Sequence, residues 1–188
     1  MLYNPGFSGL IDTYGREADC SASLSERAVC QGLVWRIGTG YQELVAKNDK
    51  LFLSFKTPTA AQCDDIHYGF STINKSGDEV IFTLNEGGVL TNGTTTTALN
   101  LNRVIGDTGC LITAIKYGKS TDTSPVSLAG GTDLPYNLLP GTAGGNSRPG
   151  GTSSGAPFIK LKYDTVYTVV FIAKGAVSIN AIVDIVVA

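Results

Sequence analysis

From Leu33 onward, apolar residues recur at every second position, and this spacing constrains the fold more than any other feature of the sequence. It is clearest in the segments that start at Leu51, Ile66 and Val80, and again in Ser178–Ala188. Successive side chains of a strand point to opposite faces of a sheet, so each segment is predicted to be a half-buried strand. The segment Val166–Ala173 is apolar on both faces, which is typical of a central strand.

Short turn signals separate these segments and favour antiparallel pairing. They are Asn74-Lys-Ser-Gly77, Glu86-Gly-Gly88, Asn92-Gly93, Gly106-Asp-Thr-Gly109 and Lys174-Gly175. About nine short strands with turn-rich spacing predict an all-β fold, an antiparallel β-sandwich of jelly-roll-like type. Strands do not alternate with long helical patterns anywhere, so a doubly wound α/β fold is excluded.

Two segments depart from this period. Residues 1–32 are predicted to form an irregular N-terminal arm, with a possible short helix after the capping-box pattern Ser23-Leu-Ser-Glu26. Residues 33–188 then form the β-sandwich domain. Within it, residues 120–156 are predicted to be a long Gly-rich loop without a convincing strand. Such a loop is either an unstructured insertion or a contact loop that becomes ordered against a partner.

Charge and hydropathy exclude two classes of partner. Only 16% of the residues are charged and the net charge is −2, so the basic stripe of a nucleic-acid-binding protein is missing. The longest apolar run, Val169–Ala173, is far shorter than the roughly 20 residues of a membrane helix. The first residues have neither the basic nor the apolar region of a secretory leader, so we expect synthesis in a cytoplasm.

The sequence offers little for catalysis or metal binding. Four widely spaced cysteines and a single histidine, His67, do not match the spacing of a zinc site. We expect structural thiols, although Cys20 and Cys30 could pair in an oxidising compartment. Gly118-Lys-Ser120 lacks the earlier glycine of a phosphate-binding loop. We therefore predict no catalytic residue, no cofactor and no metal, and a protein that is not an enzyme.

Several short motifs, taken in order along the chain, resemble a known family. These motifs are Phe55-Lys-Thr-Pro58, Ile66-His-Tyr-Gly-Phe70, Glu86-Gly87, Gly93-Thr94, Asn100-Leu-Asn-Arg103, Pro140-Gly141, Phe158-Ile-Lys-Leu161 and Asp164-Thr-Val-Tyr167. Over Leu51–Ala173 the chain resembles the β-sandwich head decoration (cement) proteins of tailed bacteriophages. In relatives of this type an Asn is commoner where Asp164 stands, and the N-terminal portion departs from the family pattern.

The resemblance implies a non-enzymatic structural protein of the virion. It would bind and stabilise the outer surface of the bacteriophage head, with the major capsid protein and further copies of itself, as a homotrimer, for partners. Its location would be the capsid surface, after synthesis in the cytoplasm of the bacterial host. The candidate contacts to other subunits or to the capsid are Trp35, Glu86, Asn100, Asn102, Arg103 and Arg148. For Trp35 we favour burial in the core over a contact role, and for the motif residues we favour structural turn and strand-end roles over contact.

Two other functions fit the same predicted fold. One is a receptor- or carbohydrate-binding module of a phage fibre, which would need an exposed aromatic cluster such as Tyr117, Tyr136 and Phe158. The other is a different coat component of the virion, which would assemble into shells by itself. The lack of a basic arm disfavours a coat protein that must neutralise packaged genome.

Overall fold

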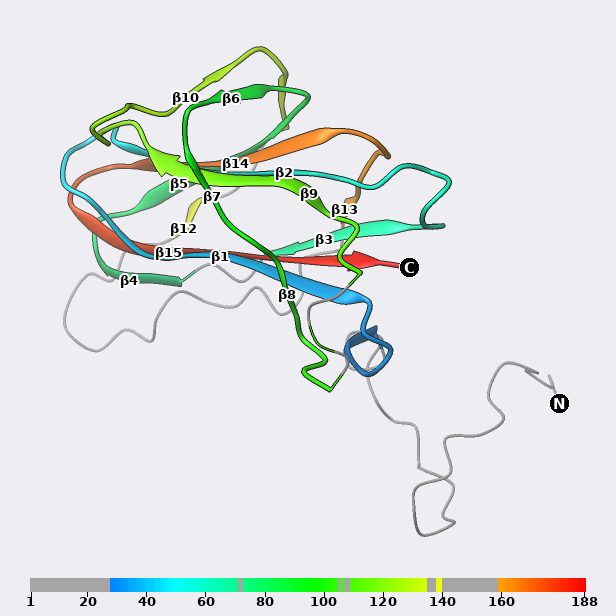
Figure 1. The fold of residues 1–188 in the computed structure, drawn as a ribbon. Coiled ribbons are helices and arrows are strands. Elements are labelled where there is room, and N and C mark those ends of the chain that lie inside the picture. The colour runs from blue at the N-terminus through cyan, green and yellow to red at the C-terminus, as the bar shows by residue number, and fades with distance from the viewer. Residues whose placement is uncertain (1–27, 71–72, 105, 107–108, 135–137, 140–158) are drawn as a thin grey trace, which may run out of the picture.

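Two antiparallel sheets packed face to face form the protein, as the alternating pattern predicts (Figure 1). The computed structural model describes residues 28–70, 73–104, 106, 109–134, 138–139 and 159–188. The first sheet has the strand order β13-β3-β15-β1-β8, and β4 pairs with the remaining part of β15. Its strands are β1 (Val34–Leu44), β3 (Ile66–Phe70), β4 (Ile73–Gly77), β8 (Leu99–Asn100), β13 (Ile159–Lys160) and β15 (Val177–Val187).

The second sheet has the order β11-β5-β14-β2-β9-β7, and β12 also pairs with β5. A separate two-stranded sheet joins β6 to β10. The strands of the second sheet are β2 (Lys50–Lys56), β5 (Val80–Glu86), β7 (Thr94–Thr95), β9 (Thr113–Lys119), β11 (Thr132–Leu134), β12 (Leu138–Leu139) and β14 (Val166–Ala173). The separate sheet contains β6 (Val89–Thr91) and β10 (Ser127–Ala129).

The order of pairing is that of a jelly roll. The first and last strands, β1 and β15, pair in one sheet, and their neighbours in the chain, β2 and β14, pair in the other. Further strands extend both sheets. In the first sheet β3 pairs with β15, and β13 pairs with β3. In the second sheet β5 pairs with β14, and β11 pairs with β5. The strands β6 to β10 lie between β5 and β11 in the chain, and two of them extend the sheets as β8 on β1 and β9 on β2.

The core lies between the two sheets and follows the predicted alternation closely. In β15 every second side chain is buried, from Ile179 to Val187, as predicted. Ile66 and Tyr68 of β3 are buried as well, and so are the inward side chains of β5. Phe82 and Phe171 pack with ring centroids 6.3 Å apart, and Phe55 stacks on Tyr167 at 6.1 Å.

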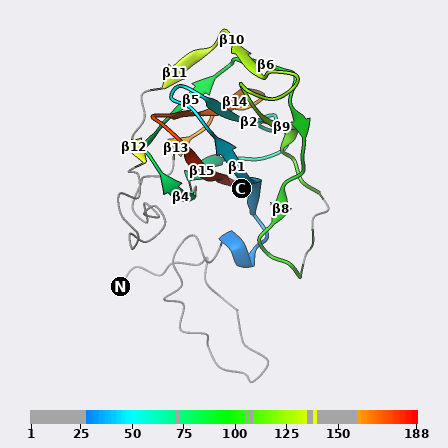
Figure 2. The same ribbon diagram turned by 90° about the vertical axis from the view of Figure 1, so that its left-hand side faces the viewer.

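The second sheet is buried on its outer face too, which explains why β14 is apolar on both faces. Phe52 and Val170 point outward from β2 and β14, and with Val126 they form a second buried cluster. Leu90 of β6 and Leu128 of β10 pack against it. The β6–β10 sheet therefore covers this face, as two views of the ribbon show (Figures 1 and 2).

Two predictions about loops and turns were wrong. The segment 120–156 contains β10, β11 and β12, three strands that are too short to show a period. Asn74-Lys-Ser-Gly77 is not a turn but most of β4, which pairs with the first part of β15, and the chain turns at Asp78 and Glu79 instead. In both cases a partner strand from a distant part of the chain decides the local structure. Residues 135–137 and 140–156 of the predicted loop lie outside the described residues.

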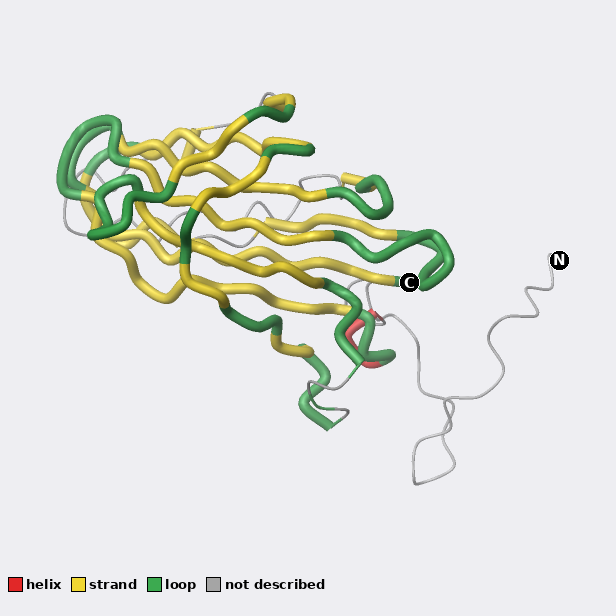
Figure 3. Tube along the Cα trace, turned by 45° about the horizontal axis from the view of Figure 1, so that its top comes forward, coloured by secondary structure: helices red, strands yellow, loops and turns green. Residues whose placement is uncertain are grey.

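A single helical turn at residues 28–30 precedes β1, coloured red in Figure 3. Leu33 N–H donates to Ala28 C=O and Gly32 N–H donates to Val29 C=O, both at 2.9 Å. Gly32 has φ +74°, so these two bonds form a Schellman ending with glycine in the left-handed position. The capping-box residues 23–26 lie outside the described part of the chain. No helix among the described residues is long and apolar enough to cross a membrane.

Candidate functional site

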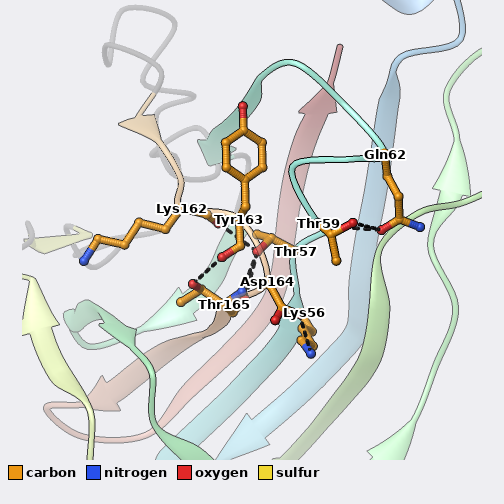
Figure 4. A network of polar contacts seen from close by, with 8 residues as sticks. All are labelled: Lys56, Thr57, Thr59, Gln62, Lys162, Tyr163, Asp164 and Thr165. Atoms are coloured by element: carbon orange, nitrogen blue, oxygen red, sulfur yellow. Dashed lines mark hydrogen bonds and ion pairs between the residues drawn. The ribbon is translucent and has the colours of Figure 1, made fainter.

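The residues that the sequence singles out gather in two places, and the first is a corner of the sandwich. There the connection from β2 to β3 meets the connection from β13 to β14 (Figure 4). The buried hydroxyl of Thr57 lies 2.8 Å from the carbonyl oxygen of Lys162 and 3.0 Å from that of Thr165, and it accepts the N–H of Thr165 at 2.9 Å. One side chain thereby satisfies backbone groups more than 100 positions away.

Asp164 gives this corner its shape. Its backbone has φ +48°, in the left-handed region that asparagine, aspartate and glycine tolerate best. Its N–H donates to the carbonyl oxygen of Pro58 at 2.8 Å, and its carboxylate lies 2.7 Å from Nζ of Lys56. A short residue that adopts this conformation is therefore what the turn requires.

Glu86, a predicted contact residue, lies at the end of β5 and bonds to the same corner. Its Oε1 is 2.5 Å from Nζ of Lys162, and its Oε2 accepts the hydroxyl of Tyr167 at 2.8 Å. The bond from Lys162, followed by that from Tyr167, holds the pKa of Glu86 below its usual value. Burial raises the pKa of Tyr167 to about 12, and the bond to Glu86 adds to this shift.

Three motifs of the family resemblance thus converge on one structural junction. Phe55-Lys-Thr-Pro58, Glu86-Gly87 and Asp164-Thr-Val-Tyr167 are far apart in the sequence, yet hydrogen bonds connect all three. Gly87 N–H, for example, donates to the carbonyl oxygen of Val166 at 2.8 Å. In the structure these residues join the two sheets at a corner.

The second gathering place, residues 99–104, lies at the other side of the first sheet, and we call it the platform. Asn100 is 1% exposed, its Nδ2 donates to Gly32 C=O at 2.9 Å, and its Oδ1 accepts the N–H of Asn102 at 2.8 Å. Asn102 repeats the pattern: its Nδ2 donates to Cys30 C=O at 2.8 Å, and its Oδ1 accepts the N–H of Val104 at 3.1 Å. Two successive Asx turns therefore fasten the platform to the turn at residues 28–32.

This arrangement reverses the expected faces of the strand. The alternation predicts that Leu99 faces the core and Asn100 faces out, whereas Leu99 is 50% exposed and Asn100 is buried. The reason is that β8 is two residues long and is held by the amide bonds rather than by an apolar face. Val104 is 96% exposed, and the sequence carries no signal that marks it.

The remaining predicted contact residues have different positions. Trp35 is opposite Asn100 in the pairing of β1 with β8, but its side chain is 5% exposed and completes the core. The position agrees with the favoured core interpretation of Trp35 and not with its candidate contact role, because a buried ring offers almost no area to a partner. Arg103 is exposed, with Nη1 3.4 Å from the carbonyl oxygen of Asn100. Arg148 lies outside the described residues.

Thiols and titratable groups form no compact constellation in the described chain. Cys30, Cys63 and Cys110 form no disulfide with one another, and the Cys110 thiol lies 3.6 Å from the carbonyl oxygen of Ile112. Cys20 is not among the described residues. His67 is half-buried, with Nε2 3.4 Å from Oδ2 of Asp65. No group of three or more His, Cys, Asp or Glu side chains in the described ranges is placed to hold a metal ion.

Comparison with known proteins adds no relative to this picture. No family model, no curated protein and no solved structure matches the chain.

The corner allows a test of how much one buried hydroxyl contributes to the stability of the fold. We predict that Thr57→Val lowers the free energy of unfolding by about 1–3 kcal/mol, because the isosteric side chain leaves buried backbone groups unpaired. Thr59→Val is the matched control, because Thr59 is exposed and its hydroxyl bonds to Gln62, which is exposed as well. It is expected to change stability by less than about 0.5 kcal/mol. Urea unfolding measures both, and equal losses would contradict the assigned role of Thr57.

The lowered pKa of Glu86 predicts a pH dependence of stability. A carboxylate whose pKa is lower in the folded state stabilises the fold at pH values above its unfolded value of about 4.5, and this contribution disappears as the pH falls through the folded value. Glu86→Gln should therefore be less stable than the parent protein at pH 7, and the difference should shrink between pH 5 and pH 3. Urea unfolding at several pH values measures this, and a difference independent of pH would rule out the ionic contribution.

Proposed function

We propose that this protein is a non-enzymatic virion component, a capsid decoration (cement) protein that binds and stabilises the outer surface of a bacteriophage head. The motif order of Leu51–Ala173, which resembles that family, supports the proposal. The jelly-roll sandwich is consistent with the family's fold. The partner that we propose is the major capsid protein, with further copies of this chain beside it.

The observation that carries the proposal is a difference between the two outer faces of the sandwich. The β6–β10 sheet covers the outer face of the second sheet. In the described residues, no strand covers the outer face of the first sheet. On this face, Arg36 and Gly38 of β1 lie opposite Asp184 and Ile182 of β15. At the edge of the sheet, Leu99 of β8 lies opposite Arg36 on its other side. A half-exposed sheet face of this kind is suited to contact with another protein.

This outer face and the platform together form a continuous surface, which we call the docking face. At its centre Arg36 makes two bonds to Asp184, at 2.7 and 2.9 Å, so the charges in the middle of the face are already paired. Ile182 and Val186 lie on the same face and are half-buried. Leu99 and Val104 supply exposed apolar side chains at the edge, and Arg103 supplies an exposed cation.

The platform presents these apolar side chains in a fixed position. Because the amides of Asn100 and Asn102 hold the backbone, Leu99 and Val104 lose little conformational freedom when a partner covers them. The platform also bonds to Cys30 C=O, next to the point at which residues 1–27 join the domain. A capsid subunit bound here would therefore lie beside the turn at residues 28–32.

The binding test uses heads that lack this protein. We predict that the double variant Leu99→Asp, Val104→Asp binds such heads at least tenfold more weakly, because burial of each side chain is worth about 1.5–3 kcal/mol and 1.4 kcal/mol is a factor of ten. Co-sedimentation over a range of protein concentrations measures the affinity.

The matched control is Val45→Asp, which changes an exposed valine that directly follows β1, at the end of this strand away from the platform. It should bind as the parent protein does, and circular dichroism should show the same fold for all variants. Unchanged binding of the double variant would reject the docking face, and no binding of the parent protein would reject the function.

Self-association is a separate expectation of this proposal. An obligate trimer would bury about 2,000 Å² or more, typical of permanent interfaces. Light scattering of the purified protein should then give a mass near three times 19.7 kDa. A stable monomer would favour a small binding module, and a closed shell would favour a coat protein that assembles alone.

A further inference from the structure

A polar cleft lies near the opposite end of β1 from Trp35, away from the platform. It has a volume of about 590 Å³, within the range of small-molecule sites. Gln42 of β1 lines one part, Thr94 of β7 and Tyr117 of β9 line another, and the loop after β9 contributes Asp122 and Thr123. The cleft thus lies where an edge of the second sheet meets the end of a strand of the first sheet.

Hydrogen bonds and close packing hold the walls of the cleft. Asn92 Nδ2 donates to the carbonyl oxygen of Pro125 at 2.9 Å, which joins the turn after β6 to the loop after β9. Asp122 Oδ2 accepts the N–H of Lys119 at 2.7 Å and closes that loop. A Cβ added at Gly118 would come within 2.5 Å of Val126, so the loop lies directly against β9. The cleft is therefore a preformed feature of the fold.

The chemistry of the lining favours a ligand with many hydroxyl groups and no charge. Thr94, Thr123 and Ser124 contribute hydroxyls, each of which can both donate and accept a hydrogen bond. The amide of Gln42 donates to Thr39 C=O through Nε2, which leaves its carbonyl oxygen as an acceptor. Tyr117 adds an aromatic ring and a phenol hydroxyl.

The charges of the lining cancel. Lys119 Nζ lies 3.7 Å from Oδ1 of Asp122, and these are the only charged residues that line the cleft in the described chain. A phosphate or another anion would contact Lys119, whose charge Asp122 already neutralises. An apolar ligand would contact mostly polar groups. A neutral polyol satisfies the hydroxyls and the amide without leaving a charge unpaired.

We infer that this cleft binds a neutral saccharide of one or two sugar units. This inference does not depend on the proposed attachment to a capsid, because the cleft and the docking face share no residue. A sugar in the cleft would exchange hydrogen bonds with the hydroxyl side chains and place a C–H face against Tyr117. A protein that carries both surfaces would be able to hold a particle and contact a glycan at once.

The test uses the purified full chain and defined sugars. Glucose, galactose, mannose, N-acetylglucosamine, maltose and lactose are each titrated at millimolar concentrations, and saturation-transfer NMR detects contact with the protein. We expect saturable binding of at least one of them. Thr123→Trp, which fills the cleft, should weaken that binding at least tenfold, and Ser124→Trp should act in the same way.

The matched control is Thr121→Trp, an exposed position on the same loop that does not line the cleft. It should bind the sugar as the parent protein does. Equal loss in Thr121→Trp and Thr123→Trp, or no saturable binding of any sugar to the folded parent protein, would overturn the inference. Stronger binding of glucuronate than of glucose would overturn the assignment to a neutral ligand. The double variant Leu99→Asp, Val104→Asp should bind sugar normally, which separates this test from that of capsid binding.

Discussion

The pairing of the two ends of the domain is the constraint on which the rest of the structure depends. β1 lies on β15 in one sheet and β2 lies on β14 in the other, so a single two-stranded ribbon crosses from layer to layer. Each of its four strands has a further partner in its sheet, since β8 and β3 flank the first pair and β9 and β5 flank the second. The ribbon therefore supplies the central strands of both layers and the facing apolar rows of the core. The corner hydroxyl of Thr57 and the insertion that carries β6 to β10 both depend on its position.

Much of the fold could be predicted because the ribbon and its neighbours are long enough to show a period. The alternation in β3, β5 and β15 identified the buried side chains, and the two-faced apolar character of β14 identified a central strand. The short strands could not be found in this way, because two or three residues define no period. β8 even has its faces reversed, since amide hydrogen bonds and not an apolar face hold it in place. Which strands pair could not be predicted either, because partners such as Arg36 and Asp184 are 148 positions apart.

The candidate site shows a similar division between what the sequence marks and what it leaves unmarked. Residues that stand out in the sequence, such as Thr57, Glu86 and Asn100, have side chains that satisfy backbone groups or each other. Such residues lie where the backbone turns and its polar groups need hydrogen-bond partners. They therefore stand out in the sequence because of their role in folding. The side chains that remain available to a partner, Leu99 and Val104, are ordinary aliphatic residues. Only the three-dimensional structure shows that the neighbouring asparagines hold them out of the core.

The pairing of distant strands also has a kinetic consequence. Because β1 cannot find β15 until nearly the whole domain has been synthesised, the native sheet cannot grow from its first strand outward as translation proceeds. The nascent chain therefore carries an apolar, alternating strand without its partner for most of its synthesis, and such strands associate readily with one another. Folding dominated by such long-range contacts is slow compared with that of helical proteins of similar size. Once closed, however, the ribbon joins both sheets, so one sheet cannot separate without disturbing the other, and the domain is expected to unfold as a single cooperative unit.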